Sequence, residues 1–143
     1  MKMRRKKRAG LTQAQLNRWY DALEGNSDEE FTQVKETLAV FRGNRCVGMC
    51  CLGVFLHVND DRPWRDKEHG QSVSGQIGGI LDPHTWGELF DNTFPLSRLK
   101  TELRKQGIDF NAYSSQKVFA LLNDDKNFTF TDIAKLARKV ARK

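Results

Sequence analysis

Three cysteines lie within six residues of one another and are the first candidates for chemistry in this chain: Cys46, Cys50 and Cys51. In a helix, Cys46 and Cys50 would share one face at i and i+4, and one of the histidines could complete a tetrahedral zinc site. The segment has no Cys-x-x-Cys pair, however, and cysteine in an apolar stretch is usually a small buried hydrophobe. We therefore predict that the cysteines pack in the core, and we expect neither a metal ion nor another cofactor.

The nearest approach to an acid–base pair is His69, which follows Glu68 directly. General acid–base catalysis needs groups within hydrogen-bond reach of a substrate, whereas neighbours in sequence usually point apart. The glycine-containing segment 75–79 lacks the spacing of a phosphate-binding loop, and no Gly-x-Ser-x-Gly nucleophile motif occurs. The sequence therefore predicts solvated loops here and a non-enzymatic protein.

Positive charge is concentrated at the two ends of the sequence. The first eight residues include six basic side chains, Lys2, Arg4, Arg5, Lys6, Lys7 and Arg8. Residues 10–97 hold 7 Lys/Arg and 13 Asp/Glu, whereas residues 98–143 hold 11 and 5, and the formal net charge is +6. Two basic ends around an acidic middle suit a partner that is rich in phosphate.

Length and composition limit the class of protein. A chain of 143 residues is the size of one domain and can bury a core without disulfides. No apolar run reaches the roughly 20 residues that a membrane-spanning helix needs, and no signal-peptide apolar segment follows the basic start. Clustered thiols suit a reducing compartment. We expect a cytoplasmic protein with no membrane partner.

Two parts of the middle of the chain carry separate expectations. The segment 46–58 is the most apolar and should form the core, although its periodicity fits a helix or a strand. Gly43-Asn44 favours a turn, so a small strand pair is predicted around Leu38 to Val47. Residues 62–79 are predicted to form a long surface loop anchored at Trp64, which is a candidate contact for a protein partner.

Capping signals predict several helices. The first runs from Leu11 to Leu23 with Thr12 as its N-cap, and three more are expected over 82–90, 96–106 and 115–123. The last begins at the capping box Thr129-x-x-Asp132. Its apolar stripe consists of Ile133, Leu136, Ala137 and Val140, and its basic surface consists of Lys135, Arg138, Lys139 and Arg142.

Four short motifs give the chain a resemblance to known sequences: Trp19-Tyr-Asp-Ala-Leu-Glu-Gly25, Cys50-Cys-Leu-Gly-Val54, Leu121-Leu-Asn-Asp-Asp125 and Phe130-Thr-Asp-Ile-Ala134. Together they resemble a family of small uncharacterised phage and prophage proteins with a central Cys-Cys-Leu-Gly-Val motif. The resemblance touches most of the chain from Leu11 onward and implies a viral origin and expression inside a bacterial host cell. It implies no particular activity, and the basic start of the chain lies outside the shared motifs.

The predicted fold is a helix-dominated α+β domain over residues 11–143 with a small β-hairpin, preceded by a disordered basic arm at residues 1–10. The predicted core consists of Leu16, Trp19, Leu23, Phe41, Cys50, Leu52, Val54, Phe55, Trp86, Leu89, Phe119, Leu122, Ile133 and Val140.

The predicted function is sequence-tolerant binding of DNA, RNA or a nucleoprotein by the two basic ends. The alternative is a phage-encoded inhibitor that docks on a host protein, for host takeover or anti-defence, through the Trp64 loop or the acidic middle.

Overall fold

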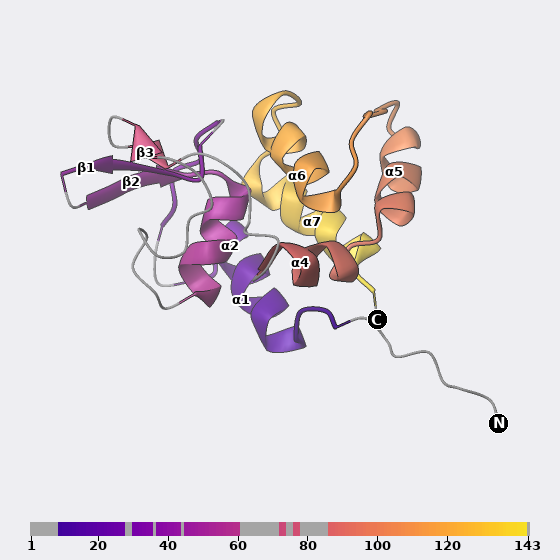
Figure 1. Cartoon of the computed structure of the whole chain (residues 1–143), viewed down its shortest axis with the longest axis horizontal. Coiled ribbons are helices and arrows are strands. Elements are labelled where there is room, and N and C mark those ends of the chain that lie inside the picture. Colours follow the sequence, from indigo (N-terminus) through magenta and orange to yellow (C-terminus); the bar gives the residue numbers. More distant parts are fainter. Residues whose placement is uncertain are drawn as a thin grey trace.

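The computed structural model describes residues 9–27, 30–35, 37–43, 45–60, 72–73, 76–77 and 86–142. A small sheet lies at one end of the molecule and a group of helices fills the other (Figure 1). The helices are α1 (Gln13–Leu23), α2 (Cys51–Asn59), α4 (Glu88–Thr93), α5 (Leu96–Arg104), α6 (Ser115–Asp124) and α7 (Phe130–Val140). The strands are β1 (Ala39–Arg42), β2 (Arg45–Met49), β3 (Ser72–Val73) and β4 (Gln76–Ile77). The predicted helix-dominated α+β class is confirmed.

The sheet is built around the predicted hairpin. β1 and β2 pair antiparallel, with Arg42 opposite Arg45, and Gly43 in the connecting turn has a φ of 62° that favours glycine. The strand order is β2-β1-β4-β3, because β4 pairs with β1 and β3 pairs with β4. The prediction of a long surface loop over 62–79 is therefore wrong at the four residues of this range that the structure describes, which are strand residues of the sheet. Their backbone pairing is not revealed by sequence periodicity. Trp64 lies outside the described residues.

The apolar segment 46–58 is neither one helix nor one strand. It continues β2 to Met49, turns at Cys50, and enters α2 at Cys51. Cys46 thus lies in a strand, and Cys50 precedes a helix. The two cysteines therefore do not share a helical face, which is the arrangement considered for a zinc site. Gly53 permits this corner, because a Cβ there would lie 1.8 Å from the Leu38 carbonyl oxygen.

The core is centred on the fully buried indole of Trp19 in α1. Its ring lies 5.4–5.9 Å from five other aromatic rings, those of Tyr20, Phe55, Phe90, Phe94 and Phe119. The indole Nε1 donates a 2.9 Å hydrogen bond to the Cys51 carbonyl, which joins α1 to the start of α2. The predicted core is confirmed except at Phe41, Trp86 and Leu89, which are only partly buried.

The predicted helix starts are confirmed wherever the structure describes them. Thr12 and Thr129 form capping boxes at α1 and α7, and the Ser114 hydroxyl accepts from the Lys117 amide at α6. The expected N-cap Asp82 lies outside the described residues. Within them, a wide helical turn at Trp86–Gly87 leads into α4. None of the helices in the described part of the chain is long and apolar enough to cross a membrane.

Candidate nucleic-acid interface

The basic side chains of the last helix lie on one side of it. Ile133, Leu136, Ala137 and Val140 are buried, whereas the basic residues at i, i+3, i+4 and i+7 are exposed: Lys135, Arg138, Lys139 and Arg142. Arg142 follows the end of α7 by two residues. The amphipathic division predicted for this helix is therefore confirmed.

Arg138 forms intramolecular contacts with α1. Its guanidinium forms an ion pair with Glu24, at the end of α1, and lies 4.5 Å from the centre of the Tyr20 ring. The hydrogen bond with Glu24 raises the pKa of Arg138, and the two opposite charges offset one another. A phosphate group would therefore meet less net charge at Arg138 than the sequence suggests.

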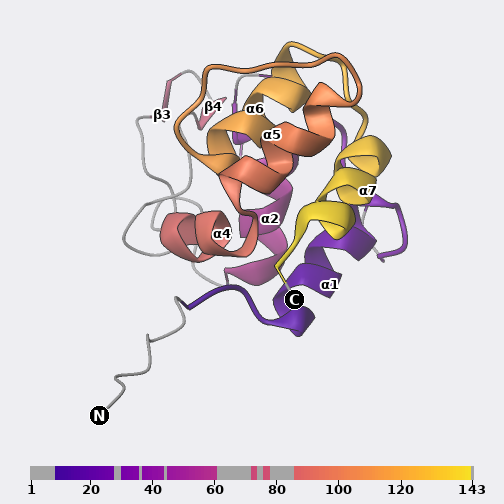
Figure 2. The ribbon, with the colours of Figure 1, turned by 90° about the vertical axis from the view of Figure 1, so that its right-hand side faces the viewer.

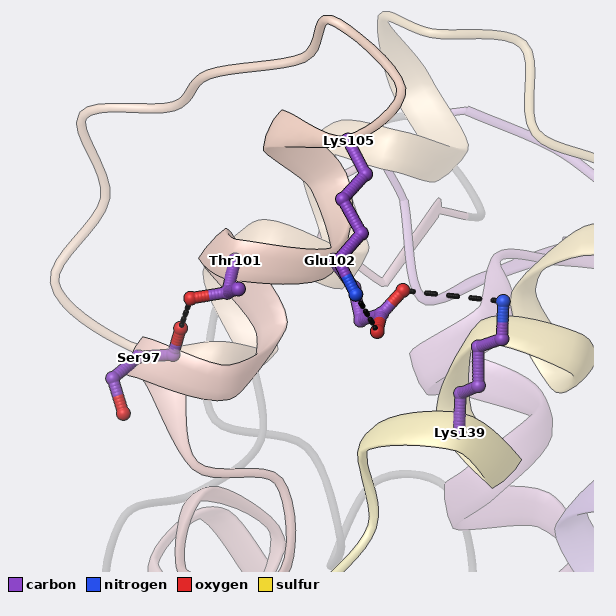
Figure 3. Close-up of polar contacts among 5 residues, drawn as sticks. All are labelled: Ser97, Thr101, Glu102, Lys105 and Lys139. Atoms are coloured by element: carbon purple, nitrogen blue, oxygen red, sulfur yellow. Dashed lines mark hydrogen bonds and ion pairs between the residues drawn. The ribbon is translucent and has the colours of Figure 1, made fainter.

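Lys139 shares a carboxylate with a second lysine. Glu102 in α5 lies 3.0 Å from Lys105 Nζ and 3.9 Å from Lys139 Nζ, so that one acidic side chain joins α5 to α7 (Figure 3). Two cations beside one anion leave a local excess of one positive charge. Lys135, one turn earlier in α7, is exposed and has no ion-pair partner among the described residues. Lys135, Lys139, Glu102 and Lys105 together therefore give this part of the surface a net positive charge.

Arg98 fixes the other end of the contact between α5 and α7. Its Nη1 lies 3.4 and 3.3 Å from the carbonyl oxygens of Val140 and Ala141, at the carboxyl end of α7. A cation at this position stabilises the exposed carbonyls and the negative end of the helix dipole. Figure 2 shows the result, with α5 and α7 side by side on one face of the molecule.

Thr93, the last residue of α4, holds the two ends of the described chain together. Its Oγ1 accepts a 2.7 Å hydrogen bond from the Leu11 amide, and its carbonyl accepts one of the same length from the Arg142 amide. The Asn92 side chain adds a 2.8 Å bond to the Ala9 carbonyl. The segment that leads back to the basic arm and the segment that carries Arg142 thus leave the body at one corner, which we name the Thr93 corner.

The cysteines and histidines do not form a metal site in the described structure. Cys50 and Cys51 are buried, and burial raises the pKa of the Cys50 thiol to about 11 and raises the pKa of the Cys51 thiol well above its usual value. Among the described residues no group of three or more His, Cys, Asp or Glu could hold a metal ion. His57 packs its ring against Phe31, with centroids 5.5 Å apart. The predicted core packing of cysteine is confirmed at Cys50 and Cys51, while Cys46 is only half-buried.

Several predicted site residues lie outside the described residues: Lys2, Arg4, Arg5, Lys6, Lys7, Arg8 and Trp64. His69, for which no catalytic role is predicted, lies outside them too. Sequence reasoning missed Thr93, because an isolated threonine at the end of a short helix carries no distinguishing pattern. It also missed Glu24 and Glu102 as partners of the basic helix. Their contacts span 114 and 37 residues of sequence, and no local spacing rule reaches that far.

Comparison of this chain with protein-family models, with curated proteins and with solved structures gives no match.

Proposed function

We propose that this protein is a non-enzymatic binder of nucleic acid whose two basic ends form one continuous phosphate-contacting surface. The observation that carries the proposal is the Thr93 corner, where the amides of Leu11 and Arg142 are bonded to the same threonine. Residue 9, which follows the six basic residues in the sequence, therefore lies close to the segment that carries Arg142.

The distribution of charge among the helices supports the same surface. α5 carries Arg98, Lys100 and Arg104 against Glu102, and α7 carries Lys135, Arg138 and Lys139 against Asp132, so each has a net charge of +2. Of the other described helices, α4 has a net charge of −2, and α1, α2 and α6 are neutral. Because α5 and α7 are in contact, the two most positively charged of the described helices are adjacent, which supports the attraction of a polyanion to this part of the surface.

The expected binding mode is contact with the phosphate backbone. Lysines and arginines on an exposed helix face and in a tethered arm neutralise phosphates without reading base edges. The affinity should therefore depend strongly on salt and weakly on sequence.

The test is a salt titration of binding to a fluorescent oligonucleotide, single-stranded or duplex, between about 50 and 200 mM salt. The logarithm of the affinity should fall linearly with the logarithm of the salt concentration, and deleting residues 1–8 should reduce the slope by several units. Lys135→Ala with Lys139→Ala should reduce it by about one unit for each phosphate that is no longer neutralised. Arg138 is left intact because its ion pair with Glu24 belongs to the packing of α1 on α7.

The matched control removes two charges at the opposite end of the molecule. Arg42 and Arg45 are exposed at the turn of the β1–β2 hairpin, far from α5 and α7 in Figure 1. Arg42→Ala with Arg45→Ala should leave the slope unchanged. If the intact protein fails to bind at 50 mM salt, or if both double variants reduce the slope equally, the proposal is wrong. Failure to bind would make docking on a host protein the next hypothesis to test.

A further inference from the structure

A groove of about 380 Å³ lies along α7, beside the turn that precedes this helix and the segment that follows α5. Its lining residues are Gln106, Phe128, Asp132, Lys135, Leu136 and Lys139. Its volume falls within the usual range for small-ligand sites. The lining brings an aromatic ring and a leucine together with two lysines, so apolar and cationic surfaces meet in one groove.

Phe128 is held in place by its backbone. Asn127, directly before it, has a φ of 56°, and its side chain accepts a 2.6 Å hydrogen bond from Lys35 Nζ. The Phe128 amide donates to the Leu122 carbonyl at 3.2 Å, and the Phe128 carbonyl accepts from Gln33 Nε2 at 2.7 Å. The Phe128 side chain is only half-buried and lines the groove. It therefore offers a fixed aromatic surface near the start of α7.

The charges of the groove are distributed unevenly along α7. Asp132 lies in the first turn of the helix, and the exposed lysines Lys135 and Lys139 follow about one and two turns later. Lys135 has no ion-pair partner among the described residues, and Glu102, 3.9 Å from Lys139, is shared with Lys105. Positive charge is thus in excess toward the end of α7. An anionic group would bind there, and the apolar part of the same ligand would lie toward the aromatic ring.

A nucleotide has this distribution of groups, because its base has a flat apolar face and its phosphate is anionic. Bases stack on aromatic side chains, and phosphates bind to lysine. In a duplex each base is stacked between its neighbours, where a half-buried ring on the wall of a groove cannot reach its face. In a single strand the bases can be splayed out and stacked on protein side chains. The groove therefore suits a single strand better than a duplex.

We propose that this groove binds one nucleotide of a single-stranded nucleic acid, with its base against Phe128 and Leu136 and its phosphate at Lys135 and Lys139. This inference rests on the proposed function and narrows its substrate class from nucleic acid in general to single strands. The Gln106 amide, on the α5 side of the groove, can both donate and accept hydrogen bonds. It can therefore bond to the edges of different bases, in keeping with sequence-tolerant binding.

The test compares a single-stranded oligonucleotide with a hairpin duplex that has the same number of phosphates, by fluorescence anisotropy at fixed salt. Phe128→Leu keeps an apolar side chain but removes the stacking surface. It should weaken binding of the single strand by about fivefold or more and leave binding of the hairpin unchanged. The salt slope should not change, because no charge is lost, whereas Lys135→Ala with Lys139→Ala should reduce it.

The matched control is Phe31→Leu. Phe31 is also half-buried, but its ring packs against His57 in α2 and it does not line the groove. This variant should bind both oligonucleotides as the unaltered protein does, and circular dichroism checks that both leucine variants are folded. A second measurement needs no substitution. In the complex of the unaltered protein with the single strand, NMR should show nuclear Overhauser effects between base protons and the ring protons of Phe128.

Three results would overturn this inference. They are equal binding of the single strand by Phe128→Leu and Phe31→Leu, equal weakening of single strand and hairpin by Phe128→Leu, and no Overhauser effect at the Phe128 ring. With any of them, a salt slope that depends on the arm and on the lysines would leave the proposed function in place. If neither oligonucleotide binds at about 50 mM salt, the proposed function is wrong and this inference is wrong with it.

Discussion

At the level of single residues, the thiols of the Cys-Cys-Leu-Gly-Val segment are placed where they cannot react. Cys51 is fully buried, and its Sγ lies 3.6 Å from the Phe119 carbonyl oxygen. The sequence allowed core packing to be predicted for Cys50 and Cys51 because they stand within an apolar run. It did not reveal that Cys46 lies on a strand at the margin of that core.

Thiol reactivity should distinguish the three cysteines. Only the thiolate attacks an aromatic disulfide reagent, and burial keeps Cys50 and Cys51 protonated at neutral pH. We expect at most one thiol, that of Cys46, to react rapidly in the native protein, and all three to react in denaturant. Cys46→Ser should abolish the rapid phase. A second rapid thiol in the native state would show that the corner between β2 and α2 is more open than the burial of Cys50 and Cys51 indicates.

Tyr20 should make stability depend on pH in the alkaline range. The pKa of Tyr20 is about 12 in the folded protein and about 10 in an unfolded chain, so the unfolded state loses its proton first. Folding stability is then intact below pH 10 and falls as the pH rises from 10 to 12, by roughly 2–3 kcal/mol at 1.36 kcal/mol per unit. Urea unfolding of Tyr20→Phe should lack this part of the decline, whereas Tyr113→Phe should retain it. Equal declines in the two variants would contradict the burial of the Tyr20 hydroxyl.

At the level of elements, sequence reasoning succeeded where the signal is local. The caps Thr12, Ser114 and Thr129 each accept a hydrogen bond from the amide three residues ahead, and such short-range bonds can be recognised from residue types. The division of segment 46–58 into β2 and α2 could not be predicted in this way. Cys50 provides no side-chain cap, and α2 begins instead with a bond from the Cys51 amide to Asn123, 72 residues away.

Asn123 should therefore contribute more to stability than an ordinary asparagine. Its fully buried Oδ1 accepts from the Cys51 amide and from the Gln33 side chain, and its Nδ2 donates to the Val34 carbonyl. Asn123→Ala removes the partner of the buried Cys51 amide and of the Val34 carbonyl, although Gln33 keeps its bond to the Phe128 carbonyl. We expect a loss of about 2–4 kcal/mol in the free energy of unfolding. Chemical denaturation of the unaltered protein and of Asn123→Ala measures this difference in the free energy of unfolding.

The control for this change is Asn17→Ala. Asn17 is exposed in α1 and accepts one bond from Gln13, so its replacement should cost less than about 0.5 kcal/mol. If both alanine variants unfold at the same denaturant concentration, Asn123 does not join α2, α6 and the segment before β1 as the hydrogen bonds indicate.

At the level of the whole molecule, the two basic ends and the acidic middle could be read from the sequence, but their arrangement could not. Charge counts do not show that Arg138 is paired with Glu24, or that Glu102 lies between two lysines. Nor do they show that Thr93 brings residues 9–11 and Arg142 together. These contacts depend on how helices from distant parts of the chain pack, which only the folded structure specifies.

Thr93→Val tests whether the corner matters for binding without changing any charge. Valine has nearly the same shape as threonine but cannot accept the bond from the Leu11 amide, whereas the bond from Arg142 to the backbone carbonyl remains available. Gly10 also packs closely against the Thr93 side chain, because a Cβ added at Gly10 would lie 2.9 Å from Thr93 Oγ1. Replacing that oxygen by a larger methyl group should therefore push residues 9–11 away from α4. Residues 9–11 are then held less firmly beside the end of α7, which lowers the effective concentration there of any phosphate-binding group that precedes them. We expect the affinity for an oligonucleotide to drop severalfold while the salt slope stays the same, because the number of basic residues is unchanged.

The control for Thr93→Val is Thr101→Val. Thr101 also donates its hydroxyl to a carbonyl one helical turn earlier, that of Ser97 (Figure 3). Thr101 is exposed on α5, and in the described structure its hydroxyl forms no bond with residues 9–11 or Arg142. Both variants are compared by fluorescence anisotropy at a temperature where circular dichroism shows each to be folded. Thr93→Val removes a partly buried hydrogen bond and should lower the free energy of unfolding by about 1–2 kcal/mol. The temperature of the binding measurement is therefore chosen so that this less stable variant is still folded. Weaker binding by Thr93→Val alone, at an unchanged slope, would establish that the tethering of the arm contributes to affinity separately from its charge. Equal binding by the two variants would mean that the arm contacts nucleic acid independently of the corner.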